Sequence, residues 1–214
     1  MVFHALNRGV GRMKIFSAER DYLAFEEAVE ETLTLYPMRV LAYCLMPNHW
    51  HFLLWPEEDG QLSAFLQRLT NTHTQRWQRA KQKVGYGHLY QGRFKSFPVE
   101  TNDHFYSVAR YVERNALRAG LVEQAEDWRW GSLWRRVQKV KSPLLTKWPI
   151  AMPRNWRQLV NQAQTEAELA AVRRSIQRNS PYGSDAWTAR TASALGLLST
   201  LRPRGRPKLE TNDR

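Results

Sequence analysis

With 214 residues, of which 43% are apolar, the chain is long enough to bury the core of one ordinary domain and to carry an appendage. Its formal net charge of +12 indicates a polyanionic partner, either an acidic polymer or an anionic membrane surface. The single cysteine, Cys44, excludes a disulfide framework, and without a signal peptide or an apolar run of transmembrane length we expect a cytoplasmic protein.

The chain is predicted to begin with a strand at residues 2–6, a glycine-containing loop at 7–11 and a helix that starts near Ser17. His4 could face a site, although packing on the sheet is the simpler role. The helix has apolar side chains at helical spacing, namely Tyr22, Phe25, Ala28, Val29 and Leu33. Its outer face is expected to be solvated and turned away from a polyanion, because it carries four acidic side chains: Glu26, Glu27, Glu30 and Glu31.

Residues 38–55 predict a β-hairpin with its turn at 46–48. Because side chains alternate along a strand, His49 and His51 should lie on one face of the second strand and Trp50 on the other. Two neighbouring imidazoles can supply two ligands of a metal site. The same spacing is also common for two half-exposed histidines on an edge strand, so the pair alone does not establish such a site.

A second helix is predicted from residue 62 to about residue 83, and residues 60–99 contain no aspartate or glutamate. Seven cations occupy this window: Arg68, Arg76, Arg79, Lys81, Lys83, Arg93 and Lys95. Four aromatic residues are interleaved with them: Trp77, Tyr86, Tyr90 and Phe94. Cations that track phosphates, together with rings that stack on bases, are typical of single-stranded nucleic-acid binding. The alternative is a soluble basic helix whose aromatic side chains belong to the core.

A further strand at residues 94–100 and a helix from Asn102 or Asp103 to Arg118 complete the predicted first domain. On that helix Tyr111 and Asn115 are four residues apart and therefore share one face. The βαββαβ order followed by a helix predicts an α+β, ferredoxin-like sandwich, with an antiparallel sheet and helices on one face. The last helix could then bring Tyr111 and Asn115 against the histidines.

We expect four segments along the chain: a first domain at residues 1–140, a proline-containing linker at 141–153, a helical appendage at 154–201 and a basic tail at 202–214. The appendage could read DNA, for instance as a helix-turn-helix, or could pack on the first domain. The tail resembles an AT-hook, in which Arg204 and Arg206 would enter a narrow minor groove, and it should be disordered without DNA. A solvated tail that binds phosphates non-specifically is the alternative.

Residues 46–52, Met-Pro-Asn-His-Trp-His-Phe, resemble the His-hydrophobic-His motif of the HUH single-tyrosine transposases. Four further segments resemble the branch called REP-associated tyrosine transposases: residues 4–9, 87–95, 110–122 and 127–132. The resemblance covers roughly residues 1–135, with its motifs in the right order. The family often has proline after the helix asparagine, where this chain has Ala116, and we expect alanine to lengthen or stiffen this turn.

The resemblance implies that residues 1–140 form a metal-dependent single-stranded DNA endonuclease and strand transferase that acts on REP-type hairpins. His49, His51 and Asn115 would hold one Mg²⁺ or Mn²⁺, and Tyr111 would attack the scissile phosphate to give a 5′-phosphotyrosine and a free 3′-hydroxyl. The proton acceptor for the tyrosine stays open between a metal-bound hydroxide, His4 and the substrate.

The expected partner is hairpin DNA, bound by a monomer or a homodimer, without a membrane and without a nucleotide cofactor. Expected DNA contacts are Arg8, Arg68, Arg76, Arg79, Lys81, Lys83, Tyr90, Arg93, Lys95, Arg204 and Arg206. Two alternatives remain: a non-catalytic hairpin-binding regulator that keeps the fold, and a zinc-type nuclease that uses water. The presence of all four candidate site residues favours the transposase.

Overall fold

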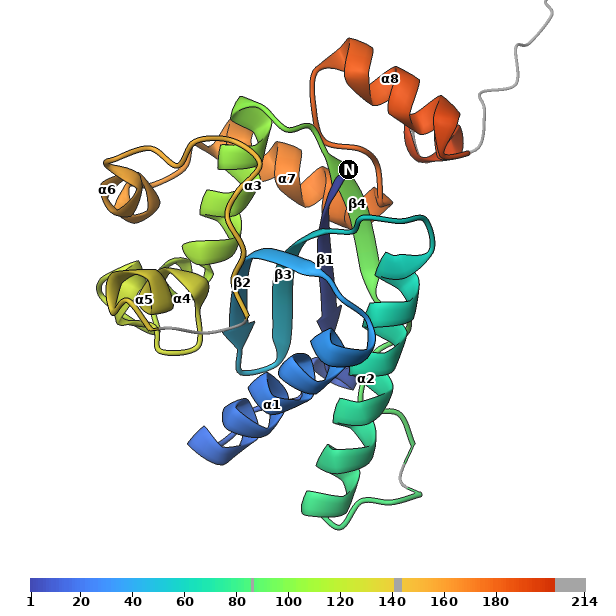
Figure 1. Cartoon of the computed structure of the whole chain (residues 1–214), viewed down its shortest axis with the longest axis vertical. Coiled ribbons are helices and arrows are strands. Elements are labelled where there is room, and N and C mark those ends of the chain that lie inside the picture. Colours follow the sequence, from blue (N-terminus) through green and yellow to red (C-terminus); the bar gives the residue numbers. More distant parts are fainter. Residues whose placement is uncertain (86, 141–143, 203–214) are drawn as a thin grey trace, which may run out of the picture.

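The computed structural model describes residues 1–85, 87–140 and 144–202. These residues form a four-stranded antiparallel sheet in the order β2-β3-β1-β4. The strands are β1 (Val2–Arg8), β2 (Arg39–Met46), β3 (His49–Trp55) and β4 (Lys95–Val99). With α1 (Glu19–Leu35) after β1 and α2 (Gln61–Ala80) after β3, the predicted βαββαβ order and α+β class are confirmed (Figure 1).

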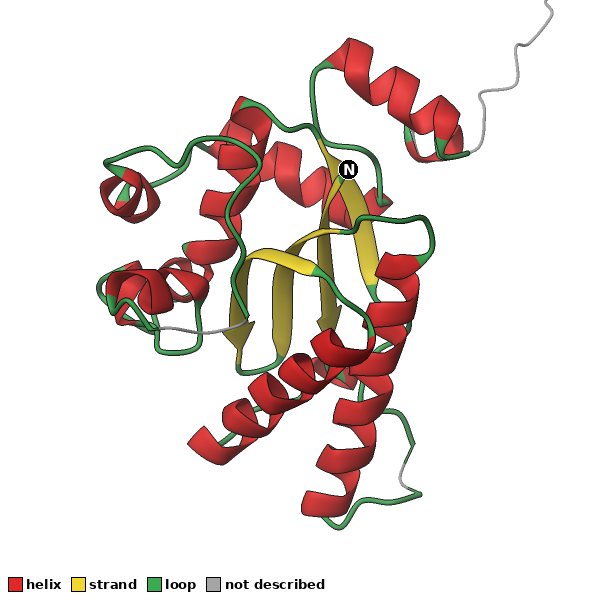
Figure 2. Ribbon diagram, in the orientation of Figure 1, coloured by secondary structure: helices red, strands yellow, loops and turns green. Residues whose placement is uncertain are grey.

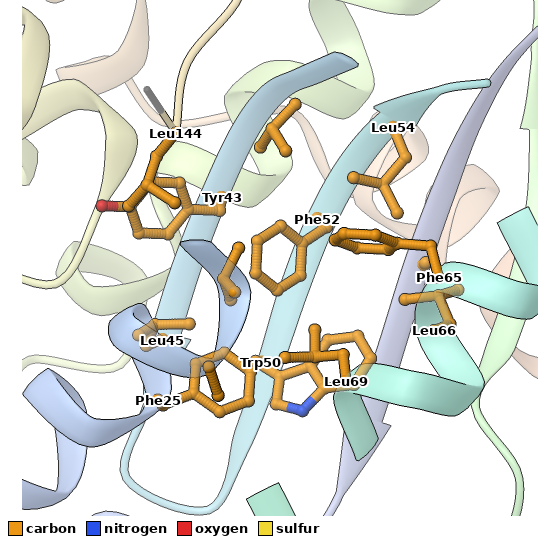
Figure 3. Close-up of a cluster of buried hydrophobic side chains, with 14 of the residues drawn as sticks. Phe25, Tyr43, Leu45, Trp50, Phe52, Leu54, Phe65, Leu66, Leu69 and Leu144 are labelled. Carbon is orange, nitrogen blue, oxygen red and sulfur yellow. The ribbon is translucent and has the colours of Figure 1, made fainter. Parts of the chain in front are cut away.

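The two faces of the sheet are covered by different helices (Figure 2). On one face, Phe25 of α1 and Phe65 of α2 share a buried cluster with Trp50 of β3 (Figure 3). On the other face, Val108 of α3 (Asp103–Glu113) shares a second cluster with Leu53. The expected layer of helices on one face of the sheet consists of α1 and α2. The helix α3 forms a second layer on the opposite face, where the histidines lie.

Glu26 corrects the expectation that all four glutamates of α1 are solvated. Its side chain is buried, accepts a hydrogen bond from the Tyr43 hydroxyl at 3.0 Å and pairs with Arg135 at 2.8 Å. Glu26 follows Phe25 directly on the inner side of the helix, so it lies over β2 and not over solvent. The tyrosine and the arginine compensate the cost of burying its charge.

The predicted helix from residue 102 to Arg118 is interrupted in the structure. α3 ends at Glu113, and α4 (Asn115–Arg118) begins after Arg114. Ala116 is a good helix former and is fully buried. Even so, α3 and α4 are not joined into the single helix that the sequence predicted. Gly120, with φ at +67°, then ends α4 as predicted.

Two of the C-terminal helices, α6 (Trp156–Asn161) and α7 (Glu166–Arg178), pack on α3, and α8 (Asp185–Ala194) follows them in the chain. Trp156 and Val172 belong to the same buried cluster as Val108. Arg110 of α3 and Arg114, which follows α3, donate to the last carbonyl groups of α6, including those of Leu159 and Val160, where cations stabilise a helix terminus.

The remaining short elements are η1 (Val10–Arg12), η2 (Ala125–Asp127), α5 (Ser132–Val137) and η3 (Leu198–Thr200). The described part of the expected linker runs along β2. Leu144 belongs to the buried cluster of α1 and α2, and Trp148, whose indole donates to the Leu41 carbonyl at 2.7 Å, packs against the cluster of α3. Within the described ranges, no helix combines the length and apolar character needed to cross a bilayer.

Candidate active site

His49 and His51 lie on the face of β3 that is covered by α3, with their ring centroids 4.9 Å apart. The antiparallel register places Arg8 of β1 directly opposite His49. β3 is an inner strand of the sheet, so the histidines are not the half-exposed pair of an edge strand. His51 is almost fully buried.

Both histidine rings are oriented by hydrogen bonds to Nδ1. His51 Nδ1 pairs with His4 Nε2 at 2.9 Å, and His49 Nδ1 pairs with Asn48 Oδ1 at 2.5 Å. Across the part of the chain that the structure describes, neither Nε2 atom has a hydrogen-bond partner. This arrangement is typical of metal-binding histidines, whose second ring nitrogen is held by a neighbour.

Burial lowers the pKa of both His4 and His49 to about 3, and it also holds the pKa of His51 well below its ordinary value. Nearby charges act in the same direction, with Arg8 and Arg118 contributing at His49. All three imidazoles are therefore neutral at pH 7, which is the form that binds a metal. His4 therefore faces the site as a hydrogen-bond partner of His51, whereas the sequence favoured simple packing on the sheet.

Tyr111, on the last turn of α3, lies against these histidines. Its ring is edge-on to His51, with a centroid distance of 5.8 Å, and 6.4 Å from the centroid of His4. Asn115, at the start of α4, is also buried. The structure therefore places Tyr111 against the histidines, with Asn115 buried one helical turn further along the chain.

Arg118 connects Tyr111 with Asn115 and was not selected by sequence reasoning. Its Nη1 donates to the Tyr111 carbonyl at 3.2 Å, and its Nη2 donates to Asn115 Oδ1 at 2.9 Å. The guanidinium carbon also lies 4.1 Å from the centroid of the Tyr111 ring. Spacings of seven and three residues place Arg118 on the helical face of both residues, a signal that the sequence contained.

The residues present fit a divalent cation that is bound by two imidazoles and one amide. His49 and His51 each offer a free Nε2, and the second lone pair of Asn115 Oδ1 remains beside its bond to Arg118. The buried Asn115 Nδ2 has no partner among the described residues. In the described ranges, no group of three His, Cys, Asp or Glu side chains could hold a metal.

The structure corrects one of the expected DNA contacts, Tyr90. Its side chain is buried, and its hydroxyl accepts from the Trp50 indole at 2.9 Å and pairs with His73 Nδ1 at 2.6 Å. A ring enclosed in the core cannot stack on a base. Tyr90 is therefore an aromatic residue of the core, which was the alternative to base stacking for residues 60–99.

Two of the expected DNA-contacting cations are held in ion pairs with α1. Arg76 pairs with Glu31 at 2.6 Å, and Lys81 pairs with Asp21 at 2.9 Å. Five other candidates are exposed and form no ion pair within the described part of the chain: Arg68, Arg79, Lys83, Arg93 and Lys95. Tyr86, Arg204 and Arg206 lie outside the described residues.

Comparison with known proteins identifies similar chains. A family model described as "Transposase IS200 like" matches residues 1–115. A REP-associated tyrosine transposase from Haemophilus influenzae is 26% identical over 127 residues, which is 55% of this chain and 72% of that protein. The solved structure of a REP-associated tyrosine transposase bound to a REP hairpin covers 72% of this chain and 88% of its own, with a TM-score of 0.54 and 18% identity, and therefore supports the fold.

Proposed function

Because the chain belongs to the IS200-like transposase family, in the branch of REP-associated tyrosine transposases, we propose that it cleaves and rejoins single strands of DNA beside REP-type hairpins. It is an enzyme of the transposase type. The observation that carries the proposal is the pair of neutral imidazoles with Tyr111 against them on the α3 side of the sheet, together with Asn115, which Arg118 links to Tyr111.

In the proposed reaction Tyr111 is the nucleophile. Its Oη forms a bond to the scissile phosphorus and loses its proton, while the bond between phosphorus and the 3′ oxygen breaks and that oxygen takes up a proton. The products are a 5′-phosphotyrosine and a free 3′-hydroxyl. Since the covalent link conserves the phosphoester, attack by a second 3′-hydroxyl releases Tyr111 and joins the strands.

Transposases of this family generally depend on a metal, and we assign that role to Mg²⁺ or Mn²⁺ held by His49, His51 and Asn115. Such a cation, when bound, polarises the scissile phosphate. The three ligands carry no charge, so the phosphate itself would supply the negative charge near the cation. His4 orients His51 through the bond between their rings.

Two arginines extend the site beyond these ligands. Arg8 lies opposite His49 in the sheet, and Arg118 lies over the Tyr111 ring. Both are suited to attract a phosphate group, and Arg118 also favours a tyrosine whose oxygen gains negative charge. His4 is a poor candidate for the base that accepts the tyrosine proton, because burial lowers its pKa to about 3 and its Nε2 is engaged by His51.

Cleavage of labelled hairpin DNA tests the proposal. The substrate is single-stranded DNA carrying the repeats that flank the gene, incubated with Mn²⁺ or with EDTA. We expect cleavage only with the metal, and loss of cleavage in His49→Ala, His51→Ala and Tyr111→Phe. His104→Ala, which changes a histidine outside the site, is the matched control and should cleave normally. Cleavage by Tyr111→Phe at the rate of the unchanged protein would contradict the nucleophile assignment and favour hydrolysis by water.

A further inference from the structure

The helix α7 belongs to the C-terminal appendage, yet it packs on the face of the sheet that carries the histidines. It lies between α3 and β4 and packs against both (Figure 1). Leu169 and Val172 of α7 share a buried cluster with Tyr111 and with Phe97 of β4. The ring of Phe97 in turn lies 4.8 Å from the ring of His4. The appendage therefore borders the candidate active site.

Arg173 follows Val172 and flanks the buried stripe of α7. It comes four residues after Leu169 and three before the half-buried Ile176, so these three side chains neighbour one another on the helix. The Arg173 side chain is exposed, and no hydrogen bond or ion pair joins it to a residue in the described ranges. Arg174 is exposed and unpaired in the same way, but it lies about 100° further round the helix, away from Leu169.

The charge of Arg173 adds to two cations that already border the histidines. Burial lowers the pKa of Arg118, Tyr111 raises it, and the positive charge of Arg173 lowers it again, so the two guanidinium groups are close enough to repel each other. Arg8 is the third cation. Its Nε is buried without a partner among the described residues, and its charge acts on His49 as that of Arg118 does.

The positive charge of these three arginines is not balanced by the protein. Within the described part of the chain, no carboxylate forms an ion pair with any of them. Two nearby glutamates have other partners, since Glu168 pairs with Arg110 at 3.5 Å and Glu113 accepts from the Trp156 indole at 2.6 Å. Like charges that converge without a counter-charge favour the entry of an anion.

We propose that Arg173 binds a phosphate of the cleaved DNA strand, so that the C-terminal appendage completes the active site. The proposal rests on the proposed function and adds to it a residue from beyond the range 1–115 that the family model matches. Arg8 and Arg118 act on His49, whereas Arg173 acts on Arg118, so we assign to Arg173 the phosphate next to the scissile one. A guanidinium group can donate two parallel hydrogen bonds to a phosphate.

The test measures the coupling between Arg173 and single phosphates in binding, without cleavage. Full-length protein carrying Tyr111→Phe is titrated with hairpin DNA from the repeats that flank the gene. In a series of these DNAs, each phosphate of the single strand beside the stem is replaced in turn by an uncharged methylphosphonate. The dissociation constants are compared with those of the same protein carrying Arg173→Gln in addition. Arg174→Gln, which removes the neighbouring exposed charge, is the matched control.

We expect Arg173→Gln to weaken binding of the unmodified DNA by roughly tenfold. A methylphosphonate at one position should weaken binding by a similar factor when Arg173 is present and have little effect in Arg173→Gln, because each change removes the same contact. Arg174→Gln should keep the full effect of that methylphosphonate.

Methylphosphonate effects that are the same with and without Arg173 at every position would overturn the proposal, as would equal losses in Arg173→Gln and Arg174→Gln. The outcome is independent of the nucleophile, because every protein compared carries Tyr111→Phe. Absence of a covalent adduct in the unchanged protein would contradict the proposed chemistry and leave the coupling of Arg173 to a phosphate standing.

Discussion

Arg118 is the residue whose removal should separate positioning from DNA binding. It holds the Tyr111 carbonyl and the Asn115 amide with two different nitrogens of one planar group. Lysine keeps the charge but cannot form this two-pronged contact. We predict that Arg118→Lys lowers the rate of strand cleavage at saturating DNA by roughly 100-fold, because the tyrosine loses its fixed position.

The measurement is a single-turnover cleavage rate compared with the dissociation constant for the same DNA. We expect the dissociation constant of Arg118→Lys to stay within a few-fold of that of the unchanged protein. A cleavage rate equal to that of the unchanged protein would mean that only the charge of Arg118 is needed. Equal losses in rate and affinity would instead place Arg118 in DNA binding.

His73 should make the protein less stable in acid. Burial lowers its pKa from 6.5 to about 3, and its Nδ1 pairs with the Tyr90 hydroxyl. Between these values the unfolded chain takes up a proton that the folded chain does not, so the free energy of unfolding falls as the pH falls, by about 1.4 kcal/mol per pH unit. His4, His49 and His51 act in the same direction.

Urea unfolding of the full chain at pH 7, 6 and 5 tests this prediction against His73→Gln, which cannot be protonated but still offers an acceptor to Tyr90. The variant should lose stability less steeply below pH 6.5. Identical slopes for the two proteins would show that His73 is not protonated on unfolding in this range.

Alternation and helical spacing predicted that His49 and His51 share one face and that Tyr111 and Asn115 share another. Their assignment to one site came from the resemblance to the transposase family. These patterns could not select the bond between His4 and His51, because it joins neighbouring strands that lie 47 residues apart in the chain. Tyr90 was misjudged for a related reason. An interleaved aromatic residue has the same sequence pattern whether its hydroxyl faces solvent or bonds to buried groups.

At the scale of elements, α6 holds the tyrosine helix in place. Trp156 is buried against α3, and its indole donates to the Glu113 carboxylate at 2.6 Å, beside the carbonyl bonds made by Arg110 and Arg114. We predict that Trp156→Ala lowers the free energy of unfolding by about 3–5 kcal/mol, the usual cost of emptying a buried tryptophan site. Denaturant unfolding measures the change.

The half-buried Trp187 on α8 provides the comparison. Trp187→Ala should cost clearly less, because α8 does not share the buried cluster of α3 in the described structure. If Trp156→Ala left stability unchanged, α6 would be an appendage that folds apart from α3. The sequence predicted a helical appendage at residues 154–201, but periodicity within one helix does not reveal which neighbour its apolar face meets.

At the scale of the whole molecule, the charge of +12 is distributed unevenly, and only part of it is available to DNA. Arg79 is exposed and unpaired within the described ranges, whereas Arg76 on the same helix is paired with Glu31. We predict that Arg79→Gln reduces the slope of log affinity against log salt by about 0.7, the value for one phosphate contact on single-stranded DNA.

Arg76→Gln serves as the matched control and should change the slope less, because its charge is already partly compensated. Fluorescence anisotropy with labelled hairpin DNA at several salt concentrations gives both slopes. Equal changes in the two variants would contradict the assignment of Arg79 as the better phosphate contact. Composition predicted the polyanionic partner, and only the fold could show which cations the acidic helix α1 neutralises.

The proposed strand cleavage depends on a covalent bond between Tyr111 and DNA. The most direct measurement is mass spectrometry of the protein after incubation with hairpin DNA and Mn²⁺, followed by nuclease and protease digestion. We expect a nucleotide-sized mass increase on the peptide that contains Tyr111, dependent on the metal and absent in Tyr111→Phe. DNA cleaved with no modified peptide, or with the added mass on another residue, would contradict it.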